Sequence, residues 1–82
     1  MKYLIMTRDE WDRSLAEEMI EAGVHVAAEG LTGPELARGD VASPAVTGFY
    51  LIDCGAGEAG AWAARSGDCE LRPVLEDGGQ EF

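Results

Sequence analysis

GFYLIDCGAGEAGAWAARSGDCELRP, residues 48–73, is the stretch that decides the fold. Its first seven residues are dense in aromatic and branched side chains, which predicts a strand. Residues 58–66 predict a short helix that ends at Gly67. The inward side of this helix consists of Ala59, Trp62 and Ala63. Residues 69–75 predict a further strand, which Pro73 restricts to an edge of the sheet or to the strand's own end.

A second unit of the same kind precedes this stretch. Lys2–Thr7 is apolar and β-prone, which predicts a central strand. The threonine that ends it and Glu10, three positions later, form a capping-box pattern, so a helix is expected over residues 8–22. Its apolar stripe is Trp11, Leu15, Met19 and Ile20. Gly23 supplies the left-handed stop, and residues 24–31 predict a strand with Val24, Val26 and Ala28 on one face.

These elements predict an α+β protein with one domain, residues 1–82. Residues 32–47 are expected to form a loop, with a short helical turn over residues 34–38, and residues 76–82 a frayed tail. The order βαββαβ predicts a ferredoxin-like fold, an antiparallel four-stranded sheet with both helices on one face. Tyr3 and Ile5 alternate with Leu4 and Met6, so both faces of the sheet carry apolar side chains. We therefore expect a homodimer that packs sheet against sheet.

The charge balance restricts the partners. Sixteen acidic and six basic residues among 82 give a net charge of −10, which disfavours binding to nucleic acid and to anionic membrane surfaces. No apolar run is long enough to span a membrane, and the N-terminus lacks a signal-peptide pattern, so a soluble cytoplasmic protein is expected. Cys54 and Cys69 form no CxxC pair, and the single histidine cannot complete a zinc set with them. They are read as reduced thiols, with a disulfide as the alternative.

Three segments carry a family resemblance: MKYLIM (residues 1–6), EEMIEAGVHVAAEGL (17–31) and the run GFYLIDC…AWAAR…CELRPVLE. Together they resemble the YCII-related proteins, in particular the DGPF-domain branch. The resemblance implies a dimeric α/β barrel, within a superfamily that includes small isomerases, lyases and dehydrochlorinases acting on cyclic organic acids and lactones. This chain is shortened and lacks the Asp-Gly-Pro-Phe motif. The position of the histidine that family members commonly carry on the first helix falls near Asp12.

Three residues are candidates for acid–base catalysis. His25 is the only side chain whose ordinary pKa lies close to neutrality. Glu29 lies four residues further along the same strand face, about 13 Å away, so the two can flank a ligand. Asp12 stands beside Trp11, and a carboxylate shielded by an indole has a raised pKa, which suits general acid–base work. The alternatives are an exposed or interfacial histidine and a solvated first-turn carboxylate that interacts with the helix dipole.

Three further residues are candidates for substrate binding: Arg72, Tyr50 and Trp11. Arg72 can bind a carboxylate substrate through its fork of donors, or pair with one of the many acidic residues. Trp11 is either a ligand platform or a core anchor.

The sequence contains no phosphate-binding loop, no serine nucleophile motif and no metal-ligand cluster, and no cofactor is expected. We therefore expect a small cofactor-independent enzyme, a lyase, isomerase or cyclase. It would carry out proton transfer on a small organic molecule in an apolar pocket. The alternative is a non-catalytic ligand-binding or accessory dimeric module. A third reading is a structural dimer that has lost its pocket.

Overall fold

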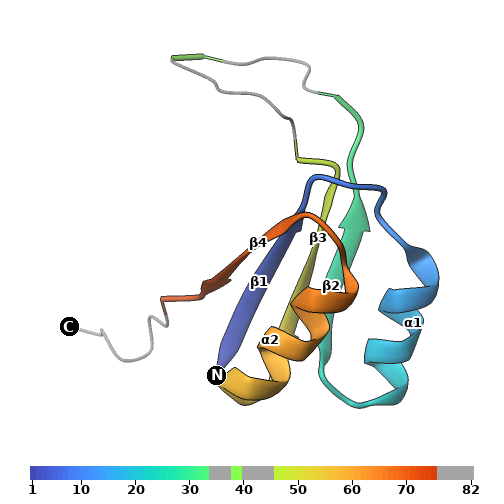
Figure 1. Ribbon diagram of the computed structural model, residues 1–82, viewed down its shortest axis with the longest axis vertical. Coiled ribbons are helices and arrows are strands. Elements are labelled where there is room, and N and C mark those ends of the chain that lie inside the picture. The colour runs from blue at the N-terminus through green and yellow to red at the C-terminus, as the bar shows by residue number, and fades with distance from the viewer. Residues whose placement is uncertain (34–37, 40–45, 76–82) are drawn as a thin grey trace.

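The computed structural model describes residues 1–33, 38–39 and 46–75. Strands and helices alternate in two βαβ units along the chain (Figure 1). In order, they are β1 (Lys2–Thr7), α1 (Arg13–Glu21), β2 (His25–Gly30), β3 (Gly48–Asp53), α2 (Ala56–Arg65) and β4 (Cys69–Pro73).

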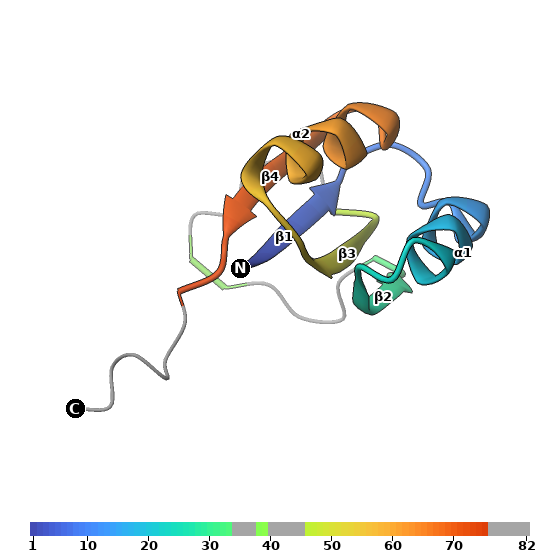
Figure 2. The same cartoon turned by 90° about the horizontal axis from the view of Figure 1, so that it is seen from below.

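The four strands form one sheet in the order β2-β3-β1-β4, and every neighbouring pair is antiparallel. Each helix connects two strands that are separated by a third, so the expected α+β architecture with a four-stranded antiparallel sheet is confirmed and is compatible with a ferredoxin-like fold. Both helices lie on the same side of the sheet (Figure 2). Neither described helix is both long and apolar enough to cross a bilayer.

The core fills the space between the helices and the sheet. The central strands contribute Ile5, Tyr50 and Ile52, whose side chains are fully buried. The helices contribute Leu15, Ala16, Met19 and Ala59. This arrangement follows from the alternation of side chains along a strand, because every second residue of β1 and β3 points toward the helices.

The opposite side of the sheet, which we call the open face, carries no described helix. The strand register aligns its residues in two adjacent rows across the sheet. One row is Glu29, Phe49, Met6 and Glu70, and the other is Ala27, Leu51, Leu4 and Arg72. The expected alternation is therefore confirmed: the two central strands have apolar side chains on both faces.

The first helix begins later than expected, at Arg13 instead of residue 8, and its N-cap is Asp12 instead of Thr7. Thr7 cannot cap a helix here because its hydroxyl shares a 2.7 Å hydrogen bond with Thr47 Oγ1 and lies 3.4 Å from the carbonyl oxygen of Gly48. The helix ends as expected, because Gly23 follows it with a left-handed φ of 78°. The expectation that Ile20 belongs to the buried apolar stripe is wrong, because its side chain is 56% exposed.

The second strand departs from the expected alternation. A β-bulge lies between His25 and Ala27, so Val26 is the extra residue and is 43% exposed. The register pairs His25 with Ile52 on the helix side, whereas Glu29 is level with Phe49 on the open face. The expected shared face of His25 and Glu29 is therefore wrong, because one additional residue reverses the alternation between them.

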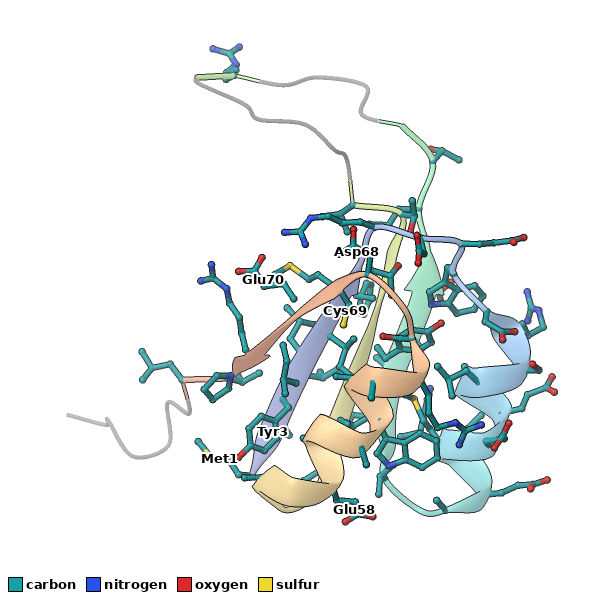
Figure 3. All side chains as sticks on the ribbon, viewed as in Figure 1. Met1, Tyr3, Glu58, Asp68, Cys69 and Glu70 are labelled. Carbon is teal, nitrogen blue, oxygen red and sulfur yellow. The ribbon has the colours of Figure 1, made fainter. Side chains whose placement is uncertain are left out.

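The cysteines are free. Cys54 follows β3, and its amide donates to the carbonyl oxygen of Met1 at 3.0 Å. Cys69 begins β4 at the end of the sheet opposite Met1 (Figure 3). A disulfide requires Cα atoms within about 7 Å, so the two thiols of one chain cannot join. The expected turn at residues 34–38, apart from Arg38, and the tail at 76–82 lie outside the described residues.

Candidate functional site

Trp11 lies in the connection between β1 and α1, where the chain passes over one end of the sheet. Its ring rests on two glycines from neighbouring strands. A Cβ on Gly48 would stand 2.5 Å from Trp11 Cδ1, and one on Gly30 would stand 3.2 Å from Trp11 Cε3. Real Cβ atoms essentially never come as close as 2.5 Å, so position 48 requires glycine for the indole to lie where it does, whereas at Gly30 a Cβ would be tight and the indole would have to shift slightly. The glycines make a flat seat for the ring.

Two further contacts fix the indole on this seat. Trp11 Nε1 donates to the carbonyl oxygen of Phe49 at 3.2 Å. The ring stacks on Tyr50 with centroids 5.8 Å apart and planes inclined by 15°. Offset stacking of this kind is favourable because the electron-rich faces avoid direct opposition. Trp11 thus fills the space between the sheet and the start of α1, which is the core-anchor role weighed against that of a ligand platform.

Asp12 is the N-cap of α1. Its Oδ1 accepts hydrogen bonds from the backbone amide of Ser14 at 2.9 Å and from the Ser14 hydroxyl at 2.8 Å. These bonds, led by that from the Ser14 side chain, hold the pKa of Asp12 below its ordinary value. The expectation of a raised pKa is therefore wrong: the carboxylate is exposed, and its hydrogen bonds stabilise the charged form. Asp12 stays ionised at neutral pH.

Tyr50 lies beneath Trp11 with its side chain fully buried. Its hydroxyl accepts a hydrogen bond from the backbone amide of Asp12 at 2.8 Å and lies 3.3 Å from the carbonyl oxygen of the same residue. Burial raises the pKa of Tyr50, so the phenol remains protonated at neutral pH. Tyr50 therefore supports Trp11 and the start of α1 instead of presenting a group to a ligand.

A shallow hollow of about 260 Å³ lies beside this cluster and is lined by Glu10, Trp11 and Asp12. The guanidinium of Arg13 lies over the Trp11 ring, with its Cζ 5.9 Å from the centroid. Glu10 is not among the six candidates from the sequence, whose pattern indicates for it only a place in a capping box. The hollow thus combines an indole edge, two carboxylates and a nearby cation.

The other candidate residues lie elsewhere. His25 begins β2, about five residues and some 16 Å along the strand from the glycine seat. Glu29 is exposed on the open face. Arg72 lies on the β4 edge of the sheet, where its Nε donates to Glu70 at 2.7 Å. Of the six candidates, the structure brings together Trp11, Asp12 and Tyr50 and separates the rest.

Glu70 lies on β4, at the edge of the sheet (Figure 3), and forms ion pairs with two arginines. Arg8 Nη2 lies 3.3 Å from Oε1 of Glu70, and Arg72 Nη2 lies 2.6 Å from Oε2. Pairing with an acidic residue, the alternative to substrate binding, is thus the state of Arg72 in the single chain. Among the described residues, no group of three or more histidine, cysteine or acidic side chains is placed to hold a metal ion.

These contacts describe two separate features: the glycine-seated tryptophan with its hollow, and the open face with its charged edge. No protein-family model and no curated protein matches this chain. The resemblance to the YCII-related proteins therefore stays a prediction from the three sequence segments that carry it.

Proposed function

We propose that this protein is a homodimeric accessory module in which two copies pack open face against open face, as in the dimeric α/β barrel of the YCII-related proteins. The observation that carries the proposal is a block of four apolar side chains on that face. Leu4 and Leu51 are level in one row, and Met6 and Phe49 are level in the next. All four are partly exposed in the single chain. A second copy would remove them from water.

The size of this face sets the expected affinity. Four strands at about 4.8 Å spacing and six residues at about 3.3 Å make a surface of about 19 by 20 Å. Measured in the plane of the sheet, two such faces together cover about 800 Å². The accessible area is larger than this, because the side chains make the surface uneven. This lies at the lower end for specific interfaces, so we expect a reversible dimer with micromolar dissociation.

The cluster around Trp11 supports an accessory role over catalysis. Asp12 is engaged as a helix cap, and its ionised form is the stabilised one. Trp11 occupies the space between helix and sheet with its own ring. A small-molecule ligand would therefore bind only in the shallow hollow beside the indole, and not in the space that the indole fills. The free thiols suit a reducing compartment such as the cytoplasm.

Sedimentation velocity over the micromolar range tests the assembly. The wild-type chain is expected to sediment increasingly as a dimer as its concentration rises. Leu51→Lys places a charge in the centre of the open face and should keep the chain monomeric. Leu4→Lys is a second variant on the neighbouring strand. Far-UV circular dichroism verifies that each variant is folded.

Ile20→Lys is the matched control, because Ile20 is an exposed apolar residue of α1 on the helix side of the sheet. It should leave dimerisation unchanged. A wild-type chain that stays monomeric throughout the range would contradict the proposed function. Equal dimerisation of wild type, Leu51→Lys and Leu4→Lys would do the same.

The second candidate function is cofactor-independent proton transfer on a small organic molecule. The hollow favours it, since Glu10 and Asp12 both line a space next to an aromatic ring. If a substrate is found, Asp12→Asn and Glu10→Gln should each reduce its turnover, because these two residues line the hollow. Unchanged turnover in both variants would remove these residues from the mechanism.

A further inference from the structure

The two edges of the open face carry opposite charge. At the β4 edge, Arg8 and Arg72 both contact the single carboxylate of Glu70, which leaves a net charge of +1. At the β2 edge, Glu29 is exposed and forms no ion pair within residues 1–33, 38–39 and 46–75. The whole chain has six basic residues against sixteen acidic ones, so two arginines at one edge are a substantial share of its positive charge.

The β4 cluster keeps the capacity to bind another carboxylate. The Arg72 side chain is 64% exposed, and both of its described contacts go to one oxygen, Oε2 of Glu70. A guanidinium has five N–H donors, so donors remain on Arg72 for a second acceptor. Glu29 and Glu70 stand at the two ends of the same row.

Two-fold symmetry permits two orientations of copies that pack open face against open face. With the two-fold axis parallel to the strands, β2 of each copy lies over β4 of the other, and equivalent rows lie over each other. With the axis perpendicular to the strands, β2 lies over β2 and β4 over β4. The first arrangement sets opposite charges together twice, and the second sets like charges together twice.

We propose that the two-fold axis of the dimer runs along the strands, so that the partner's Glu29 meets the Arg8–Glu70–Arg72 cluster. This inference rests on the proposed function, because it specifies the orientation of that dimer. Sheets that pack face to face lie about 10 Å apart, a distance that a glutamate and an arginine at the edges span together. Because the apolar block is small, the two edge contacts determine which orientation forms.

Charge reversal tests the orientation. In Glu29→Arg and in Arg72→Glu, each dimer contains two reversed contacts, so the dissociation constant should rise about tenfold. The double variant with both substitutions exchanges the two charges, and its dissociation constant should return to within about threefold of the wild-type value. Raising the salt concentration should reduce the difference in dissociation constant between each single variant and the wild type, because salt screens the edge contacts.

A control is needed for net charge, because Glu29→Arg also reduces the self-repulsion of a chain with a net charge of −10. Glu17→Arg makes the same change at an exposed position of α1. It should leave dimerisation unchanged or strengthen it slightly. The contrast between the two variants isolates the edge contact from the overall charge.

The outcomes separate the two proposals. If the wild type dimerises and Leu51→Lys does not, but both charge reversals leave the dissociation constant unchanged, the open-face dimer stands and this orientation is overturned. A double variant that stays as weak as the single ones also overturns it. If the wild type is monomeric, the proposed function itself fails.

Discussion

The glycine seat of Trp11 gives a sharp test of how the structure is held together. Gly48→Ala adds one methyl group at a point where it would lie 2.5 Å from Trp11 Cδ1 and 2.7 Å from Cγ. It would also lie 2.8 Å from the carbonyl oxygen of Glu29, a backbone atom of the neighbouring strand. The indole and the β2 backbone therefore both obstruct the methyl group.

The chain has two ways to accommodate the methyl group, and the cheaper one sets the cost. If the indole stays, the overpacking costs about 1–3 kcal/mol, and the contact with the β2 backbone places it toward the upper end. If the indole moves, the hydrogen bond to Phe49 is lost, at about 1 kcal/mol. The stacking on Tyr50 is lost as well, at about another 1 kcal/mol. Both routes predict a loss of about 2–3 kcal/mol.

Urea unfolding followed by far-UV circular dichroism measures this loss. Gly60→Ala is the matched control, because it makes the same chemical change inside α2, where a Cβ meets nothing within 4 Å. It should stabilise the protein by about 0.5–1 kcal/mol. The identical substitution thus has opposite signs at the two positions.

A double-mutant cycle with Trp11→Ala identifies the cause. Without the indole, only the contact with the Glu29 carbonyl remains, so the cost of Gly48→Ala should fall by at least about 1 kcal/mol. An equal cost of Gly48→Ala with and without Trp11 would refute the seat. So would a Gly48→Ala variant as stable as Gly60→Ala.

Three smaller predictions concern the same cluster. Gly30→Ala should destabilise less than Gly48→Ala, by about 1 kcal/mol in urea unfolding, because its Cβ would stand 3.2 Å from the indole and a small shift suffices. Tyr50 has a raised pKa in the folded chain, so its contribution to stability is complete below the ordinary value of 10.0 and is lost as the pH rises above it. In Tyr50→Phe, the free energy of unfolding should therefore depend less on pH in the alkaline range, as urea unfolding at several pH values would measure. At neutral pH the variant should be about 1 kcal/mol less stable, because the hydrogen bonds of the hydroxyl are lost. Asp12 has a lowered pKa, so its stabilising effect is complete above the ordinary value of 3.8 and is lost as the pH falls through the lowered one. Asp12→Ala should destabilise the protein at neutral pH, and thermal unfolding of the two chains should converge in acid.

The elements could be predicted from the sequence because their signals are local. Lys2–Thr7 is a strand with the expected bounds, and Gly23 and Gly67 have the left-handed φ expected at helix ends. The start of α1 could not be predicted in the same way. The hydroxyl of Thr7 is taken by Thr47, 40 residues away, and this contact exists only once the sheet has formed.

The candidate site was predicted in part for a similar reason. Trp11 and Asp12 are adjacent in the sequence, so their association needed no knowledge of the fold. The separation of His25 from Glu29 depends on a bulge for which the β2 sequence gives no clear signal. The glycine seat did leave a signal, since a glycine inside a strand indicates close approach by another group. From the sequence alone, Gly30 indicates a break in regular structure and Gly48 the start of a strand, and neither indicates a contact with Trp11.

The outer edges of the sheet differ from its interior in a way that affects how copies associate. The bulge at Val26 interrupts the pairing pattern of β2, and Pro73 in β4 has no amide hydrogen to offer. An incoming strand finds no continuous ladder on either flank, so end-to-end polymerisation of sheets is disfavoured. The two flanks of this sheet therefore give little template for the growth of fibres.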